Sequence, residues 1–166
     1  MGVETDDRYA VAREALARIP HGVAIVAAAD GDERSCATGT AMYVSFVPPM
    51  IAIAEHPGSR TYRCIERSGR FSVSFLHSAQ QDVAERAGHA APGGTGPDKF
   101  AALEIPVLQG PPGAAPAVAG SIAVLWCEVR ERTPSGDHVL VVGEVVAHRV
   151  DGSKIDALLR YRRRYA

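Results

Sequence analysis

A turn that leads into an almost wholly apolar run, Ser135 to His148, most strongly limits what this chain can fold into. Residues 134–137, Pro-Ser-Gly-Asp, are turn formers, and the β-branched run after them predicts a strand buried on both faces. The segment Ser121 to Arg130 also has the pattern of a strand, so we predict an antiparallel hairpin here. Gly143 interrupts the apolar run and predicts a bulge, or a place where another backbone or a flat ligand comes close.

The start of this predicted strand carries a histidine. His138 can exchange a proton or donate to an anion near neutral pH. A plain hairpin with a surface histidine is the alternative, and these residues alone do not decide between the two.

The rest of the chain predicts a mainly antiparallel β structure with a few short helices. Periodicity and turn residues indicate an amphipathic helix over Thr5 to Ile19, strands over Val23 to Ala29, Arg34 to Val44 and Met50 to Ala54, a helix capped by Ser59, a half-buried strand over Phe71 to Leu76, and a capping box at Ser78 to Gln81 that opens a short helix. About six or seven strands with these helices favour a small barrel with helical decorations.

Composition excludes several classes of protein. The 166 residues fit one domain, residues 1–166. A net charge of −1 and a pI near 6.6 argue against a nucleic-acid partner, and without a long apolar run we expect no membrane association. The chain opens on Met-Gly-Val-Glu with no leader pattern, and its three cysteines are far apart, so we expect a cytoplasmic protein with reduced thiols. The six histidines lack metal-ligand spacing, so no metal site is predicted.

Two stretches have the chemistry of a binding site. Small residues, among them Thr38, Gly39 and Thr40, fill the second predicted strand and suit either close sheet packing or the approach of a planar ligand. Ser59 and Thr61 at a helix start, with Arg60 beside them, predict either a simple cap or an anion site.

Together these residues resemble the flavin reductase family of the FMN-binding split barrel, whose members supply reduced flavin to two-component monooxygenases. The resemblance covers about residues 9–165 and rests on motifs that occur in the family's order. They are Pro20-His21-Gly22-Val23, Thr38 to Pro49, Ser59-Arg60-Thr61, Ser68 to Leu76, Asp98-Lys99-Phe100, Leu125 to Glu128, Gly136-Asp137-His138 with Gly143, and Leu158 to Tyr165.

The resemblance implies a Greek-key-like split β-barrel that forms a homodimer and binds FMN or FAD, with NAD(P)H as co-substrate. It implies a lining for the flavin from Thr38, Gly39, Thr40, Tyr43, Val44 and Ser45, and a phosphate site from Ser59, Arg60, Thr61 and Lys99, with Phe100 beside it. His138 is the expected catalytic-site residue on the nicotinamide side, and the tail containing Tyr161 is expected to close the pocket.

Two positions depart from the family's pattern. Ser35-Cys36-Ala37 stands where the family commonly has Gly-Met-Thr, and Tyr43 replaces a small residue. The function implied is NAD(P)H-dependent flavin reduction, with a monooxygenase as partner. The alternatives are a split-barrel protein that binds flavin or a deazaflavin without turning over NAD(P)H, and an interaction protein whose pocket has decayed.

Overall fold

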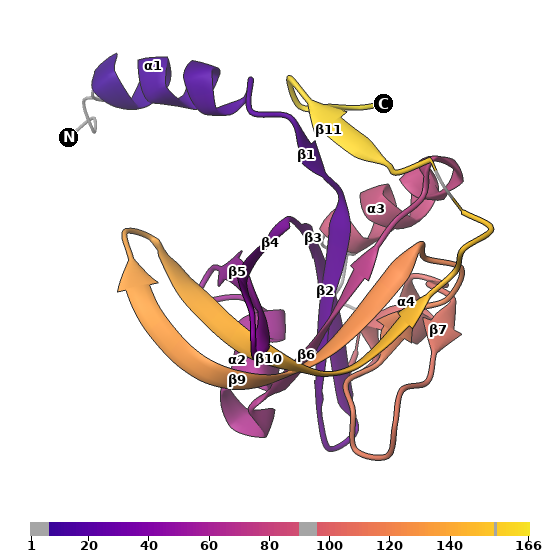
Figure 1. Cartoon of the computed structure of the whole chain (residues 1–166). Helices are drawn as coiled ribbons and strands as arrows, with labels where there is room; N and C mark the ends of the chain where they lie inside the picture. Colours follow the sequence, from indigo (N-terminus) through magenta and orange to yellow (C-terminus); the bar gives the residue numbers. More distant parts are fainter. Residues whose placement is uncertain (1–6, 90–95, 155) are drawn as a thin grey trace.

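A seven-stranded antiparallel sheet forms the body of the molecule (Figure 1). The computed structural model describes residues 7–89, 96–154 and 156–166. The strand order is β3-β2-β6-β9-β10-β5-β4. These strands are β2 Ala24–Asp30, β3 Glu33–Gly39, β4 Ala41–Phe46, β5 Pro49–Glu55, β6 Arg70–Phe75, β9 Ala123–Ser135 and β10 His138–Val150. Because only Thr40 separates β3 from β4, the two edges of the sheet approach each other, and the sheet curls into a barrel that is open between them.

The expectation of one strand over Arg34 to Val44 is wrong. β3 pairs with β2 as far as Gly39, opposite Ala24. After Thr40 the chain changes partner, and Ala41 begins a pairing with β5 opposite Ile53. The small residues of this stretch therefore belong to two strands at opposite edges of one sheet.

The predicted hairpin is confirmed as β9 and β10. His138 pairs with Ser135 across a turn in which Gly136 has a φ of 64°. β10 is not buried on both faces as predicted, since Val139 and Val141 are buried but Leu140 between them is 37% exposed. One face of this antiparallel strand packs on the core and the other meets solvent.

Gly143 lies at a register shift in the pairing of β10 with β9, which confirms the predicted bulge. A Cβ atom at this position would lie 2.5 Å from the ring of Phe71. The close approach that requires glycine is therefore made by a core side chain and not by a ligand.

Three of the helices cover the two faces of the sheet. They are α2 Arg60–Ser68, α3 Gln81–Gly88 and α4 Lys99–Ala102, and a short 3-10 helix, η1, lies at Ser78–Gln80. Tyr62 and Ile65 of α2 fill the interior of the curved sheet together with Phe71. α3 and α4 cover the other face, where Val83 and Phe100 are core residues.

Two local predictions around β6 need correction. β6 is buried on both faces, because the hydroxyls of Ser72 and Ser74, which alternate with its core residues, are covered and bond to the segment near β8. The capping box begins one residue earlier than predicted. His77 is the N-cap of η1, and its partner in the box is Gln80.

A terminal arm projects from the barrel (Figure 1). It consists of the helix α1 Asp7–Leu16 and a three-stranded ribbon of β1 His21–Gly22, β11 Leu159–Tyr161 and β12 Arg164–Tyr165. Leu16 is 64% exposed and Ile19 is 55% exposed, so these two apolar residues of the predicted amphipathic helix face solvent in this chain. The remaining pair, β7 Val107–Leu108 with β8 Ala117–Val118, lies beside the barrel. Within the described ranges, no helix combines the length and the apolar character needed to cross a bilayer.

Candidate functional site

The N-terminus of α2 is capped as the sequence predicts. The Ser59 hydroxyl accepts a hydrogen bond of 3.0 Å from the backbone N–H of Tyr62. Arg60, the first residue of the helix, forms an ion pair of 3.7 Å with Glu33 of β3 and also donates to the carbonyl oxygen of Gly96. The helix dipole and the guanidinium together make this end of α2 positive.

Lys99, at the start of α4, brings a second positive charge to this region. Its ammonium group donates to the carbonyl oxygens of Cys36 at 2.7 Å and Ala87 at 2.8 Å. Burial lowers the pKa of Lys99, and the nearby guanidinium of Arg60 lowers it further. The structure thus brings Ser59, Arg60 and Lys99 to one region, as the resemblance implies.

Thr61 has a different role from its two neighbours. Its hydroxyl is buried and lies 2.9 Å from the hydroxyl of Ser35 on β3. The Thr61 side chain therefore ties α2 to β3, and only its backbone N–H is directed toward the open end of the helix.

Glu55 lies in the candidate site, and the sequence analysis missed it. The Ser59 hydroxyl donates to its carboxylate at 3.5 Å. Burial raises the pKa of Glu55 to about 7, against the smaller lowering effects of Ser59, His138 and Lys99. The sequence could have indicated its burial, because side chains two residues apart in a strand share a face and Glu55 follows the core residues Ile51 and Ile53 at this spacing.

His138 lies beside this cluster. The next residue of the strand, Val139, pairs with Glu55, so the start of β10 lies beside the end of β5. The Nδ1 atom of His138 is 2.8 Å from a carboxylate oxygen of Asp137, and the imidazole ring meets the ring of His56 edge-on at 5.9 Å. Hydrogen bonding to His138 lowers the pKa of Asp137. A histidine is therefore held between two other polar side chains next to the positive end of α2.

A family model described as flavin reductase like domain matches residues 16–166. The chain belongs to this family.

Curated relatives agree with this assignment. Actinorhodin polyketide dimerase from Streptomyces coelicolor is 32% identical over 154 residues, which span 91% of this chain and 82% of that protein. The reductase component of 4-hydroxyphenylacetate 3-monooxygenase from Thermus thermophilus is 38% identical over 135 residues, which span 80% of this chain and 79% of that protein.

A solved structure confirms the predicted fold. The NADH:FAD oxidoreductase of Streptomyces globisporus superposes with a TM-score of 0.86 at 24% identity, and the match covers 100% of this chain and 96% of that one. The antiparallel sheet that is open between β3 and β4 is accordingly the split barrel of the flavin reductases.

The expected flavin lining of this flavin reductase-like domain lies along β3 and β4. The Thr38 hydroxyl donates to the carbonyl oxygen of Ala84 at 2.6 Å, so it supports α3. Gly39 is half-buried, while Thr40 and Val44 are exposed. Tyr43 is 68% exposed, and its ring is 5.0 Å from the ring of Phe46. Tyr43 and Ser45 line an apolar groove of about 380 Å³ between β4, β5, the start of β9 and the end of β10.

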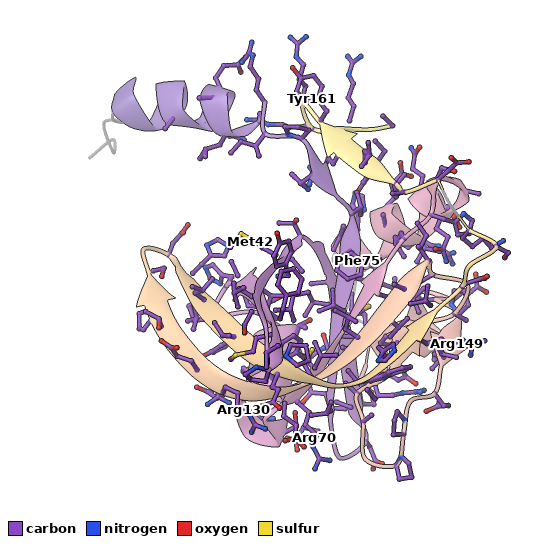
Figure 2. All side chains as sticks on the ribbon, viewed as in Figure 1. Met42, Arg70, Phe75, Arg130, Arg149 and Tyr161 are labelled. Carbon is purple, nitrogen blue, oxygen red and sulfur yellow. The ribbon has the colours of Figure 1, made fainter. Side chains whose placement is uncertain are left out.

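Two predicted site residues stand apart from the others. The Phe100 side chain has no exposed surface and belongs to the core beneath α3, so it supports α4 and offers no surface to a ligand. Tyr161 lies on the terminal ribbon, and Figure 2 shows it well away from Met42 of β4. Within one chain, the tail therefore does not close over the β3–β4 stretch.

The donor set fits a flavin nucleotide. The positive end of α2, with Arg60 and Lys99, suits a phosphate. The short side chains at 38–40 leave backbone groups accessible, and the exposed Met42 and Tyr43 offer apolar surface to a planar ring.

Proposed function

We propose that this protein is an NAD(P)H-dependent flavin reductase that acts on FMN or FAD. The observation that carries the proposal is the convergence of Ser59, Arg60 and Lys99 at the N-terminus of α2, with His138 beside them. Flavin, when bound, supplies the redox chemistry by accepting a hydride from the nicotinamide. The protein's own task is to bind and orient the two nucleotides.

The phosphate of the flavin is assigned to the positive end of α2. The guanidinium of Arg60 and the ammonium of Lys99 provide charge-assisted hydrogen bonds, which are about twice as strong as neutral ones. The positive end of the α2 dipole adds to this attraction, and the Ser59 hydroxyl holds the first turn in place by accepting from the N–H of Tyr62. Lys99 is held in place by the carbonyl oxygens of Cys36 and Ala87, so its position does not depend on the ligand.

His138 is assigned to the nicotinamide. The contact between its Nδ1 atom and Asp137 fixes the orientation of the ring and leaves Nε2 to meet a ligand. Hydride transfer needs no strong acid, so His138 acts by binding and orienting the co-substrate.

We also propose that the protein functions as a homodimer. The β4 strand lies at an edge of the sheet. Large apolar side chains on this strand and directly after it are exposed, from Met42 to Val47, and Val47 is 93% exposed. Exposed apolar residues at a sheet edge favour association with another chain. The apolar residues of the terminal arm, such as Leu16 and Leu159, would then find a partner that one chain does not provide.

A flavin-dependent monooxygenase is the proposed consumer of the reduced flavin, and the relative from Thermus thermophilus, a monooxygenase reductase component, supports this assignment.

We further propose a single domain over residues 1–166, which the extent of the family match supports. A cytoplasmic location agrees with three cysteines that are all free and buried.

The test is oxidation of NADH and of NADPH by the purified protein in air, with FMN, FAD or no added flavin. Turnover that requires added flavin is expected, and it identifies both nucleotides. Flavin binding without turnover would overturn the proposal in favour of a flavin-binding protein without reductase activity.

A further inference from the structure

Glu55 is the one charged side chain that is buried among the described residues. Only 6% of its surface is exposed, and it lies on the face of β5 that carries the core residues Ile51 and Ile53. An ionised carboxylate loses its hydration when it is buried, so such groups are paired with a positive charge or become neutral. Glu55 must therefore either be paired with positive groups or carry a proton.

Polar groups from three parts of the fold are directed toward this carboxyl. Ser59, the N-cap of α2, donates to it at 3.5 Å, while His138 of β10 and Lys99 of α4 act on it through their charges. His56, the next residue in the chain, packs against His138. The positive groups favour the carboxylate, but desolvation has the larger effect and raises the pKa of Glu55 to about 7.

A phosphate bound at the end of α2 would place further negative charge next to Glu55. Two like charges that share a small site cannot both ionise without a large cost, and the usual result is that one of them takes up a proton. Nucleotide phosphates stay ionised at neutral pH, so the carboxyl group is the one that changes.

We propose that Glu55 takes up one proton when a nucleotide phosphate binds at the N-terminus of α2, so that the bound phosphate faces a neutral carboxyl group. This inference rests on the proposed flavin-binding function. The proton comes from solvent and adds to a carboxylate oxygen, and no bond to phosphorus forms or breaks. As a neutral group, Glu55 can donate a hydrogen bond toward the site, which the carboxylate cannot do.

Linkage then determines how affinity depends on pH. If binding takes up a proton, the affinity for phosphate-bearing flavins falls as the pH rises, by up to about tenfold per pH unit where the free carboxyl is ionised. Riboflavin has the same ring without a phosphate, so its affinity is expected not to change over the same range.

The experiment measures the Kd of FMN, FAD and riboflavin by flavin fluorescence between about pH 7 and pH 9, where the FMN phosphate, with a second pKa near 6, is already fully ionised. The variants are Glu55→Gln, which keeps the shape of the side chain, and Glu66→Gln, which makes the same change at an exposed position of α2. Wild type and Glu66→Gln are expected to lose about tenfold or more in affinity for a phosphate-bearing flavin across this range, and Glu55→Gln less than about threefold.

A pH dependence with FMN, with FAD or with both supports the proposal and identifies whether a monoester or a diphosphate occupies the site. An equal pH dependence in Glu55→Gln and wild type would overturn it, because His138 or Lys99 would then be the titrating group. An affinity for FMN and FAD that is constant with pH in wild type would also overturn it.

These outcomes are separable from the reductase test. A protein that shows the linked proton uptake but oxidises no NADH would support the Glu55 inference and contradict the proposed function. A protein that reduces flavin with no pH-dependent affinity would do the reverse, and one that binds no flavin would overturn both.

Discussion

The hydroxyl groups of Ser35 and Thr61 lie 2.9 Å apart in the interior and join β3 to the first turn of α2. This pair holds the N-terminal end of the helix, the proposed phosphate site, against the edge strand of the sheet. Thr61 is adjacent to Arg60, so the position of the proposed phosphate site depends on this buried contact.

Thr61→Val is expected to destabilise the protein by about 1–3 kcal/mol, because it leaves the Ser35 hydroxyl buried without its partner. The double variant Ser35→Ala with Thr61→Val removes both polar groups and is expected to cost less than the sum of the single variants. Urea unfolding measures these differences from the transition midpoints. Thr133→Val, at an exposed position of β9, is the control and should stay within about 0.5 kcal/mol of wild type. Strictly additive single and double variants would show that the two hydroxyls do not interact.

Gly143→Ala is expected to destabilise the protein by about 1–3 kcal/mol through overpacking, because the new methyl group would lie 2.5 Å from the Phe71 ring. Adding Phe71→Leu should reduce the penalty that the alanine causes, since the smaller side chain vacates that space. Gly152→Ala, where a Cβ atom meets nothing within 4 Å, provides the control. Thermal unfolding of wild type, Gly143→Ala, Phe71→Leu, their double variant and Gly152→Ala measures the effect, and a neutral Gly143→Ala would contradict it.

Local sequence signals predicted the parts of the fold that depend on local chemistry. Ser59 and Gly69 bound α2 as expected, and the turn at Gly136 closes the β9–β10 hairpin. The break at Thr40 was not predictable from local pattern, because small residues on either side of it suit one continuous strand equally well. Only long-range pairing, with β2 on one side and β5 on the other, separates β3 from β4.

In the candidate site, too, local motifs predicted some residues, while others depend on long-range packing. Ser59, Arg60 and Lys99 were predicted from motifs, and the structure brings them together. Phe100 lies in a matching motif but is buried in the core, a fact that depends on how α4 packs against the sheet. Glu55 matches no motif, and its importance comes from burial, which a single sequence reports only through the alternation of β5.

His138→Ala is expected to raise the KM for the nicotinamide nucleotide by about tenfold, the effect of losing one hydrogen bond of about 1.4 kcal/mol, and to leave flavin affinity unchanged. Steady-state oxidation of NADH and NADPH gives the KM, and fluorescence titration gives the flavin Kd. His21→Ala on the terminal ribbon is the matched control, with no change expected in either quantity. An unaltered KM in His138→Ala would remove His138 from the nicotinamide site.

Glu55→Gln is expected to change the stability of the ligand-free protein in a pH-dependent way. The pKa of Glu55 is raised from 4.5 to about 7 in the folded protein, so between these values the folded state binds more protons than the unfolded state. Stability must therefore fall as the pH rises through this window, and wild type is expected to lose up to about 3 kcal/mol relative to Glu55→Gln between about pH 4.5 and pH 7. Above this range the difference between the two proteins should stay constant.

Urea unfolding of wild type, Glu55→Gln and Glu66→Gln without flavin measures this difference at a series of pH values. Glu66 is exposed on α2, so its variant should follow wild type at every pH. Because no ligand is present, the result bears on the carboxyl group alone and does not depend on the proposed phosphate site. If the stability difference between wild type and Glu55→Gln does not change with pH, Glu55 is ionised with an ordinary pKa in the folded protein, and its burial must then be balanced by the charges of His138 and Lys99.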